Sequence, residues 1–203
     1  MEPEGVTKFQ LHWEAGEPPA AVLVRELEHW RTRLKAVGGV GADPRRYGGI
    51  GYGNLSRRVA QGFWITGTQT GALDRLGPEH FCLVTDWDIA TNTVWAKGPL
   101  PPSSEAMSHA AFYVARPEIQ WVFHAHFPTL WHQARDLQLA CTPAPVAYGT
   151  PAMAQAVGSI AKTQPLPLLV AMLGHEDGIL AAGATAKDTG QLLLRAVARA
   201  ART

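Results

Sequence analysis

The stretch Trp121-Val122-Phe123-His124-Ala125-His126-Phe127 is the most informative part of this sequence for the fold. A run of bulky apolar residues is typical of a buried strand. Because the side chains of a strand alternate between its two faces, His124 and His126 point to the same face. Two imidazoles on one face supply half of the ligands of a metal site. The alternative is that each ring is a core histidine satisfied by a backbone carbonyl.

The length and composition of the chain indicate one domain. Of its 203 residues, 46% are hydrophobic and 17% are charged, which suffices for one well-formed core and is short for two. The formal net charge is +1, from 18 basic and 17 acidic residues that are scattered rather than clustered. We therefore expect a single domain over residues 1–203, with no nucleic-acid partner and no binding to an acidic membrane surface.

The cysteines favour a reducing compartment, and the first residues lack the pattern of a targeting signal. Cys82 and Cys141 are the only cysteines and lie in apolar surroundings, unlike a disulfide framework. The first five residues are acidic and polar, without the basic start and apolar stretch of a targeting signal. No apolar segment approaches membrane-spanning length. We expect a cytoplasmic protein.

The hydrophobic pattern predicts helices and strands mixed along the whole chain. Apolar residues recur at helical spacing in four segments, and shorter apolar runs predict strands between them. The predicted helices lie over 20–37, 105–115 and 186–203, and a fourth begins at Thr150-Pro151. Ser103-Ser104, Thr150 and a Thr185 capping box mark three of the helix starts. The predicted strands lie over 6–13, 63–65, 81–85, 93–96, 121–127 and 166–173, and a loop covers 38–53. This mixture indicates an α/β or α+β fold.

Two further residues are candidates to complete a metal site with the histidine pair. Glu105 stands at the start of one predicted helix, and His175 follows the last predicted strand. A zinc-type site needs three or four N, O or S ligands. Each residue also has an ordinary interpretation, because Glu105 offsets the helix macrodipole and His175 lies in a polar turn. His109 lies on the same helical face as Glu105, and we expect it to hold a ligand in place by a contact outside the metal site. The alternative is that it is a helix-surface residue.

Two loops rich in glycine and hydroxyl groups are candidates for anion binding. They are Gly53-Asn54-Leu55-Ser56 and Thr66-Gly67-Thr68-Gln69-Thr70-Gly71. Glycines let the backbone approach a phosphate or carboxylate closely, and hydroxyls donate hydrogen bonds to it. Ser103-Ser104 at a helix start would add a third group of donors. The alternative is that each loop is simply a tight turn between strands.

Several motifs occur here in the order in which one protein family carries them. They are Gly53-Asn54-Leu55-Ser56, Ile65-Thr66 with Thr70-Gly71, Pro102-Ser103-Ser104-Glu105 with His109, Arg116-Pro117-Glu118, His124-Ala125-His126, and His175 before a glycine. They cover roughly residues 20–200, and the set is far more specific than any single motif. On these residues the chain resembles the class II aldolase and adducin family, which includes fuculose phosphate aldolase, ribulose-phosphate epimerase and methylthioribulose-phosphate dehydratase.

The resemblance implies a fold, an assembly and a site. The implied fold is a three-layer α/β/α sandwich around a largely antiparallel sheet, assembled as a homotetramer with active sites at subunit interfaces. The implied metal is divalent, with Zn²⁺ first and Mn²⁺, Fe²⁺, Co²⁺ or Ni²⁺ as alternatives, held by His124, His126 and His175. Glu105 matches the catalytic carboxylate. The positions that match the substrate's phosphate site are Asn54, Ser56, Thr70, Gly71, Ser103 and Ser104.

The chain departs from the family pattern at three places. The family shows Thr-Pro-Ser-Gly where this chain has Thr66 to Gly71, and His-His-Gly or Asn-His-Gly where it has His175-Glu176-Asp177-Gly178. The region that supplies a tyrosine acid to the neighbouring subunit in the aldolases is short here. Only Tyr148 stands at its far end, and no role is assigned to it.

The leading hypothesis for function is a metal-dependent lyase, a class II aldolase that cleaves a small hydroxy-carbonyl or sugar-phosphate-like substrate. A metal that chelates a carbonyl and the adjacent hydroxyl stabilises the enediolate formed when a carbon–carbon bond breaks. The nearest alternative is an epimerase or dehydratase on the same site. Another is a non-catalytic oligomerisation domain like the adducin head domain, against which the three histidines and Glu105 argue.

Overall fold

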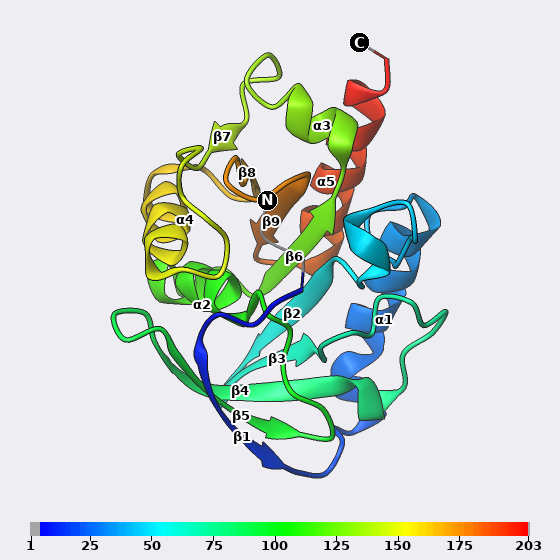
Figure 1. Ribbon diagram of the computed structural model, residues 1–203, viewed down its shortest axis with the longest axis vertical. Coiled ribbons are helices and arrows are strands. Elements are labelled where there is room, and N and C mark those ends of the chain that lie inside the picture. The colour runs from blue at the N-terminus through cyan, green and yellow to red at the C-terminus, as the bar shows by residue number, and fades with distance from the viewer. Residues whose placement is uncertain (1–4, 203) are drawn as a thin grey trace.

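A computed structural model describes residues 5–202 of the chain. The described part contains one large β-sheet with helices packed against it (Figure 1). The strands are β1 (Gln10–Ala15), β2 (Asn54–Val59), β3 (Gly62–Thr66), β4 (Phe81–Asp88), β5 (Thr93–Gly98), β6 (Trp121–His126), β7 (Ala140–Cys141), β8 (Leu168–Ala171) and β9 (Gly178–Gly183). The helices are α1 (Ala21–Ala36), α2 (Ala106–Ala115), α3 (Pro128–His132), α4 (Pro151–Thr163) and α5 (Ala186–Ala200), with short 3₁₀ turns at Tyr47–Gly49 and Pro78–His80.

The nine strands form a mixed sheet in the order β1-β5-β4-β3-β2-β6-β9-β8-β7. The inner pairs, from β5–β4 to β9–β8, are antiparallel. Both outermost pairs, β1–β5 and β7–β8, are parallel. The expectation of a largely antiparallel sheet is therefore corrected. Parallel neighbours need long connections, and each edge strand here is separated from its partner in sequence by at least one helix.

The strands near the middle of the sheet contribute alternately to two hydrophobic clusters. Val122 of β6 belongs to the cluster that includes α2 and α4, whereas Phe123 belongs to the cluster that includes α1 and α5. Since consecutive strand side chains point to opposite faces, the two clusters lie on opposite faces of the sheet. Figure 1 shows α2 and α4 together beside the strands, with α1 and α5 on the other side. His124 and His126 share the face of Val122.

The four predicted helices are present, and two of their three predicted caps are confirmed. Thr150 Oγ1 accepts a hydrogen bond from the backbone N–H of Met153, and the hydroxyl of Thr185 accepts one from Asp188. The serine cap is wrong. Glu105 itself is the N-cap of α2, and its side chain makes no capping hydrogen bond.

The strand predictions miss β2, β7 and β9 and misplace β1. Residues 54–56, predicted as loop, begin β2, whose two arginines in Asn54–Val59 hide any apolar pattern. The Arg58 guanidinium donates to the carbonyl oxygens of Ile119, Tyr113 and Arg116, so this charge is satisfied in the fold. β9 (Gly178–Gly183) also gives no clear pattern, because only Ile179 and Leu180 are large and apolar, although all six residues are buried. β1 runs over residues 10–15 rather than 6–13 because it is an exposed edge strand without a buried face.

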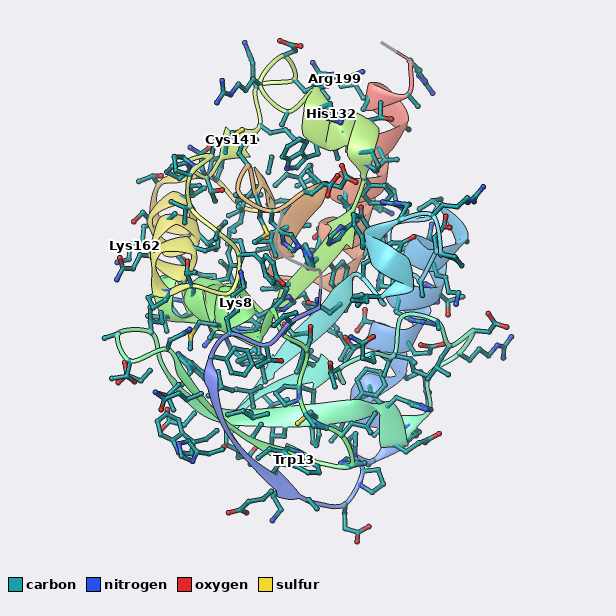
Figure 2. The ribbon with its side chains drawn as sticks, in the orientation of Figure 1. Lys8, Trp13, His132, Cys141, Lys162 and Arg199 are labelled. Carbon is teal, nitrogen blue, oxygen red and sulfur yellow. The ribbon has the colours of Figure 1, made fainter. Side chains whose placement is uncertain are left out.

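Both cysteines are free thiols in the structure. Cys82 is buried in β4, and Cys141 lies partly buried in the edge strand β7, far along the sheet from Trp13 of β1 (Figure 2). None of the helices within residues 5–202 is long and apolar enough to cross a lipid bilayer.

Candidate metal centre

The structure brings His124, His126 and His175 together in one buried cluster. One nitrogen from each ring can be chosen so that all three lie within 4.8 Å of one another. The Nε2 atoms of His124 and His126 are 3.0 Å apart, and the three pairs of ring centroids are 4.8 to 5.1 Å apart. Each residue is 2% exposed or less. Three converging imidazoles without bulk water are the donor set that a zinc-type ion prefers.

Strand pairing fixes the first two histidines. β6 lies between β2 and β9, with His124 directly opposite Asn54 on one side and Leu180 on the other. Nδ1 of His124 lies 3.3 Å from the carbonyl oxygen of Ile179, which orients the ring through its second nitrogen. The site therefore sits in the middle of the sheet, where neighbouring strands on both sides limit backbone movement.

A tight turn between β8 and β9 fixes the third histidine. The backbone N–H of His175 donates to the carbonyl of Met172, and the N–H of Gly178 donates to the carbonyl of His175. Gly174 must be glycine, because a Cβ at this position would lie 1.7 Å from the carbonyl oxygen of Val146. The sequence Gly174-His175 therefore reflects a close backbone approach that delivers the histidine to the site.

Burial keeps the histidine pair neutral. It lowers the pKa of both His124 and His126 well below the usual histidine value, and the neighbouring rings lower it further. Only a neutral imidazole has a lone pair to give to a metal ion. The pair is thus in its ligating form at neutral pH, and the donor set fits a divalent cation.

Glu105 lies at the edge of this cluster. Its Oε1 is 3.7 Å from Nδ1 of His175, and its Oε2 accepts a hydrogen bond of 2.9 Å from the hydroxyl of Ser108. The side chain is 1% exposed. A buried carboxylate beside the imidazoles can either bind the ion or move a proton near it.

His109 lies against Ser56 of β2, and its expected support of a ligand stays a prediction. Its Nδ1 lies 2.6 Å from the hydroxyl of Ser56, which in turn lies 2.7 Å from the hydroxyl of Tyr113. Its Nε2 has no hydrogen-bond partner among residues 5–202. Burial lowers the pKa of His109 to about 3, so this ring is neutral as well. The helical spacing places Glu105 and His109 on one face of α2, but the His109 side chain turns to β2 instead.

Most of the predicted anion-binding residues line one small pocket. Asn54, Thr70, Gly71, Ser103 and Ser104 all contribute to it, together with Gly5, Gly51, Gly53, Gly67, Thr68 and Gln69. Ser56, the remaining predicted member, does not line the pocket and is held by His109 and Tyr113 instead. Asn54 links the pocket to the metal centre, because it pairs with His124 across the β2–β6 ladder. Among residues 5–202 no lysine or arginine lines this pocket, so these residues would hold an anion by hydroxyl, amide and backbone groups.

Arg31 binds the backbone of the segment 70–74, part of which lines this pocket. The sequence analysis did not predict this role. Its guanidinium is 1% exposed and donates to the carbonyl oxygens of Thr70, Gly71, Leu73 and Asp74 at 2.6 to 3.1 Å. Burial lowers the pKa of Arg31. Its position in the sequence could have indicated this role, because Arg31 shares the buried face of α1 with Leu27, Trp30 and Leu34.

Two tyrosine rings lie beside the triad, and the sequence analysis did not predict them either. Tyr47 and Tyr52 contact the ring of His126 at centroid distances of 4.8 and 5.4 Å. The Tyr47 hydroxyl donates to Oδ2 of Asp177 at 2.5 Å and accepts from Arg46 at 2.7 Å. Burial raises the pKa of the Tyr47 phenol, so it stays protonated. Tyr47 lies in a loop rich in glycine and arginine, where no periodic pattern marks it.

The family can now be assigned. The model of the class II aldolase and adducin N-terminal domain matches residues 43–202. This chain belongs to the class II aldolase and adducin family. The match covers the triad, Glu105 and every predicted pocket residue, and it begins after α1. The resemblance inferred from the sequence motifs is confirmed.

Solved structures of the class II aldolase family have the same fold at low sequence identity. L-fuculose-1-phosphate aldolase from Thermus thermophilus superposes with a TM-score of 0.67 and 18% identity, over 89% of this chain and 92% of that one. A sugar-phosphate aldolase from Thermotoga maritima gives 0.64 and 16%, over 89% and 94%. YgbL from Escherichia coli, for which aldolase, epimerase and decarboxylase are named as alternatives, gives 0.66 and 17%, over 89% and 87%. No curated protein sequence matches the chain.

Proposed function

We propose that this class II aldolase family member is a metal-dependent lyase that cleaves a carbon–carbon bond in a small hydroxy-carbonyl or sugar-phosphate-like substrate. The observation that carries the proposal is the buried triad of imidazoles with the Glu105 carboxylate 3.7 Å from one of them. A non-catalytic oligomerisation domain has no need for such a set. The three-layer arrangement implied by the resemblance is part of the proposal, supported by hydrophobic clusters on both faces of the sheet.

His124, His126 and His175 would hold the divalent ion, and Zn²⁺ suits three neutral nitrogen ligands best. When bound, the ion supplies Lewis-acid stabilisation of negative charge that develops on a substrate's carbonyl and hydroxyl oxygens. Mn²⁺, Fe²⁺, Co²⁺ and Ni²⁺ remain alternatives.

Glu105 is the residue that moves the proton in this proposal. Oε2 is held by Ser108, which leaves Oε1 on the side of His175 and the triad. A buried carboxylate at this place can take a proton from a substrate hydroxyl as a carbon–carbon bond breaks and return it to carbon afterwards. The pocket of Asn54, Ser103 and Ser104 would bind the substrate's anionic end beside it.

The experiment that tests the proposal offers the zinc-loaded protein a panel of ketose phosphates and free hydroxy-keto acids. We expect release of an aldehyde or ketone, detected by a carbonyl reagent or a coupled dehydrogenase, and no release with the Glu105→Gln variant. Formation of an isomer without cleavage would instead identify an epimerase, and loss of water a dehydratase. A protein that binds zinc and transforms no member of the panel would contradict the lyase assignment in favour of a binding role.

Assembly and location belong to the same proposal. We propose a homotetramer with sites near subunit boundaries, in the cytoplasm, with a small molecule as partner and neither nucleic acid nor membrane. The free thiols of Cys82 and Cys141 and the scattered basic residues support this assignment.

A further inference from the structure

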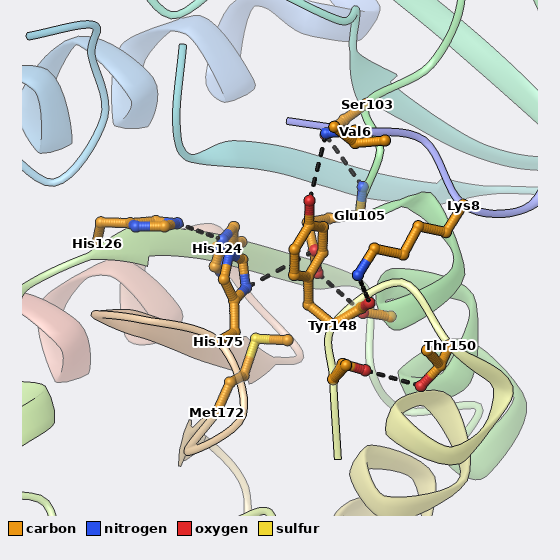
Figure 3. A network of polar contacts seen from close by, with 12 residues as sticks. Val6, Lys8, Ser103, Glu105, His124, His126, Tyr148, Thr150, Met172 and His175 are labelled. Atoms are coloured by element: carbon orange, nitrogen blue, oxygen red, sulfur yellow. Dashed lines mark hydrogen bonds and ion pairs between the residues drawn. The ribbon is translucent and has the colours of Figure 1, made fainter. Parts of the chain in front are cut away.

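Tyr148 lies between an imidazole and an ammonium group. Its ring stacks on the ring of His175, with 4.4 Å between the centroids and 21° between the planes. The Nζ atom of Lys8 lies 3.9 Å from the centroid of the same tyrosine ring. Figure 3 shows Tyr148 standing between Lys8 and His175. Since one ring face has no room for both at these separations, the two groups occupy opposite faces.

The N-terminal segment fixes this ring. The backbone N–H of Val6 donates to the hydroxyl oxygen of Tyr148 at 3.3 Å, and the Lys8 ammonium donates to its backbone carbonyl at 3.0 Å. Tyr148 is 4% exposed. Val6 and Lys8, which lie outside the metal centre, therefore fix the position and the plane of the Tyr148 ring. Val6 and Lys8 also precede residues 43–202, the part of the chain that the family model matches.

The consequence concerns the orientation of His175. The hydrogen bonds of the β8–β9 turn hold the backbone of His175, whereas the orientation of its ring depends on side-chain contacts. A metal ligand must aim its lone pair closely, and groups that fix a ligating ring commonly change metal affinity when they are removed. A parallel aromatic ring at 4.4 Å restricts this rotation.

We propose that Tyr148 is a positioning residue that holds the His175 imidazole in its metal-binding plane, and that the segment of Val6 and Lys8 holds Tyr148 in turn. The inference rests on the proposed metal centre. It assigns the role to the tyrosine ring, because the ring stacks on the His175 imidazole. Tyr148 acts through the ligand.

Two substitutions of Tyr148 separate ring from hydroxyl. Tyr148→Phe keeps the stacked ring, whereas Tyr148→Leu keeps an apolar side chain without one. Titration with zinc against a competing chelator should give dissociation constants within about threefold of wild type for the phenylalanine variant and at least about tenfold weaker for the leucine variant. The visible spectrum of the cobalt(II)-loaded protein should change for leucine only. Phe63→Leu, which removes a buried ring from β3, is the control and should leave both readouts unchanged.

Equal zinc affinity and equal cobalt spectra for the leucine variant and wild type would overturn the inference while leaving the metal centre intact. If wild type itself binds no zinc, the proposed metal centre fails first and this inference with it. Thermal unfolding shows whether the leucine variant is folded.

A second measurement needs no destabilised variant. The chain has 4 tyrosines, so selective ¹³C labelling gives a simple spectrum in which Tyr148→Phe identifies one signal. We expect the Tyr148 ring signal to shift when zinc is added and the Tyr113 signal to stay, since Tyr113 contacts Ser56 and no triad histidine. A Tyr148 signal that does not respond to zinc would overturn the inference.

Discussion

The value of His124 and His126 as ligands comes from their position as consecutive inward residues of a central strand. A loop could present two imidazoles in many arrangements, whereas β6 fixes both Cα positions through its pairing with β2 and β9. The short distance between their Nε2 atoms, 3.0 Å, requires at least one of the two rings to be neutral. At the residue scale the metal centre is therefore preorganised by backbone hydrogen bonds.

Replacing either histidine of the pair should abolish metal binding. We expect wild type purified without chelator to contain about one divalent transition metal ion per chain, and His124→Ala or His126→Ala to contain almost none, because two remaining ligands hold zinc weakly. Elemental analysis measures this, with exposed His132→Ala as the control. Wild-type protein that is metal-free and takes up no zinc would contradict the assignment.

Glu105→Gln separates proton transfer from metal binding. The amide keeps the shape of the side chain but cannot act as a base, so turnover should fall by about a hundredfold to ten-thousandfold. Metal content should stay near wild type because three histidines remain. Activity is measured on the substrate found in the panel, and metal by elemental analysis. Full activity would show that Glu105 only begins a helix, whereas loss of metal would show that it is mainly a ligand.

Among the elements, α1 supports the pocket although none of its residues lines it. Arg31 donates to four carbonyl oxygens of the segment 70–74, and Lys35 donates to the carbonyls of Ala72 and Leu73. These carbonyls are thereby turned toward the helix. Since the C=O and N–H of a peptide unit point in opposite directions, the N–H of Gly71 is turned away from Arg31. The helix thus sets the orientation of the loop backbone.

Arg31→Met should loosen this loop. The substitution leaves several carbonyl oxygens without their donor, which costs about 1–3 kcal/mol for a buried group. We expect a lower free energy of unfolding in urea and a KM raised about tenfold with kcat changed much less, because a mobile loop weakens substrate binding uniformly. Arg25→Met on the exposed face of α1 is the matched control. Equal KM values for wild type and Arg31→Met would contradict the supporting role of the helix.

The sequence predicted elements well where burial is one-sided or complete and poorly elsewhere. The spacing of Val22, Leu23, Leu27, Trp30 and Leu34 predicts α1, and the apolar run around His124 predicts β6. β2 carries adjacent arginines whose side chains donate to carbonyls of distant segments, Arg57 to Leu23 and Arg58 to the end of α2 and the α2–β6 connection. β9 has only two large apolar residues, between glycines and alanines whose burial depends on neighbouring strands. Both strands pair directly with β6, so the immediate neighbours of the metal centre were those that local pattern could not predict.

For the site, residue types at motif spacing predicted positions but not side-chain directions. The structure places Glu105 beside His175 and brings His109 and Ser56 together in a hydrogen bond. Ser56 also forms a hydrogen bond with the hydroxyl of Tyr113, which is the third member of this group. The contributions of Arg31, Tyr47 and Tyr148 arise from contacts between distant segments, which no local pattern encodes.

The whole molecule should lose stability in acid because it buries neutral histidines. The pKa of His109 is about 3 in the fold, against about 6.5 in an unfolded chain. Between these values the unfolded chain binds more protons, so the free energy of unfolding falls as pH decreases below 6.5, by up to about 1.4 kcal/mol per pH unit for each such histidine. His124 and His126 act in the same direction in metal-free protein.

Urea unfolding of chelator-treated protein at pH 7 and pH 5 measures this effect. We expect a clearly lower free energy of unfolding at pH 5, a smaller pH effect for His109→Gln, and an unchanged one for the exposed His132→Gln. A free energy of unfolding that is constant between the two pH values would mean that the histidines are protonated in the fold.

Light scattering should show a closed oligomer, with a tetramer as the expected state. Family resemblance and the 7 tryptophans of this modest chain, among them the exposed Trp13 and Trp95, favour buried contacts between subunits. Dilution to micromolar concentration should leave the assembly intact. A monomer under these conditions would contradict both the tetramer and a site shared between subunits.

The course of the N-terminal segment limits how this protein can be labelled for purification. Gly5 lines the pocket beside the triad, and Val6 bonds to the tyrosine that covers His175. A polyhistidine tag fused before residue 1 would be joined to Gly5 by four residues, and its nearest residue would lie within about 17 Å of Gly5 even along fully extended chain. Its imidazoles would compete with the triad for the same ions. The number of metal ions per chain therefore reports the occupancy of the triad only for protein without a polyhistidine tag at this end.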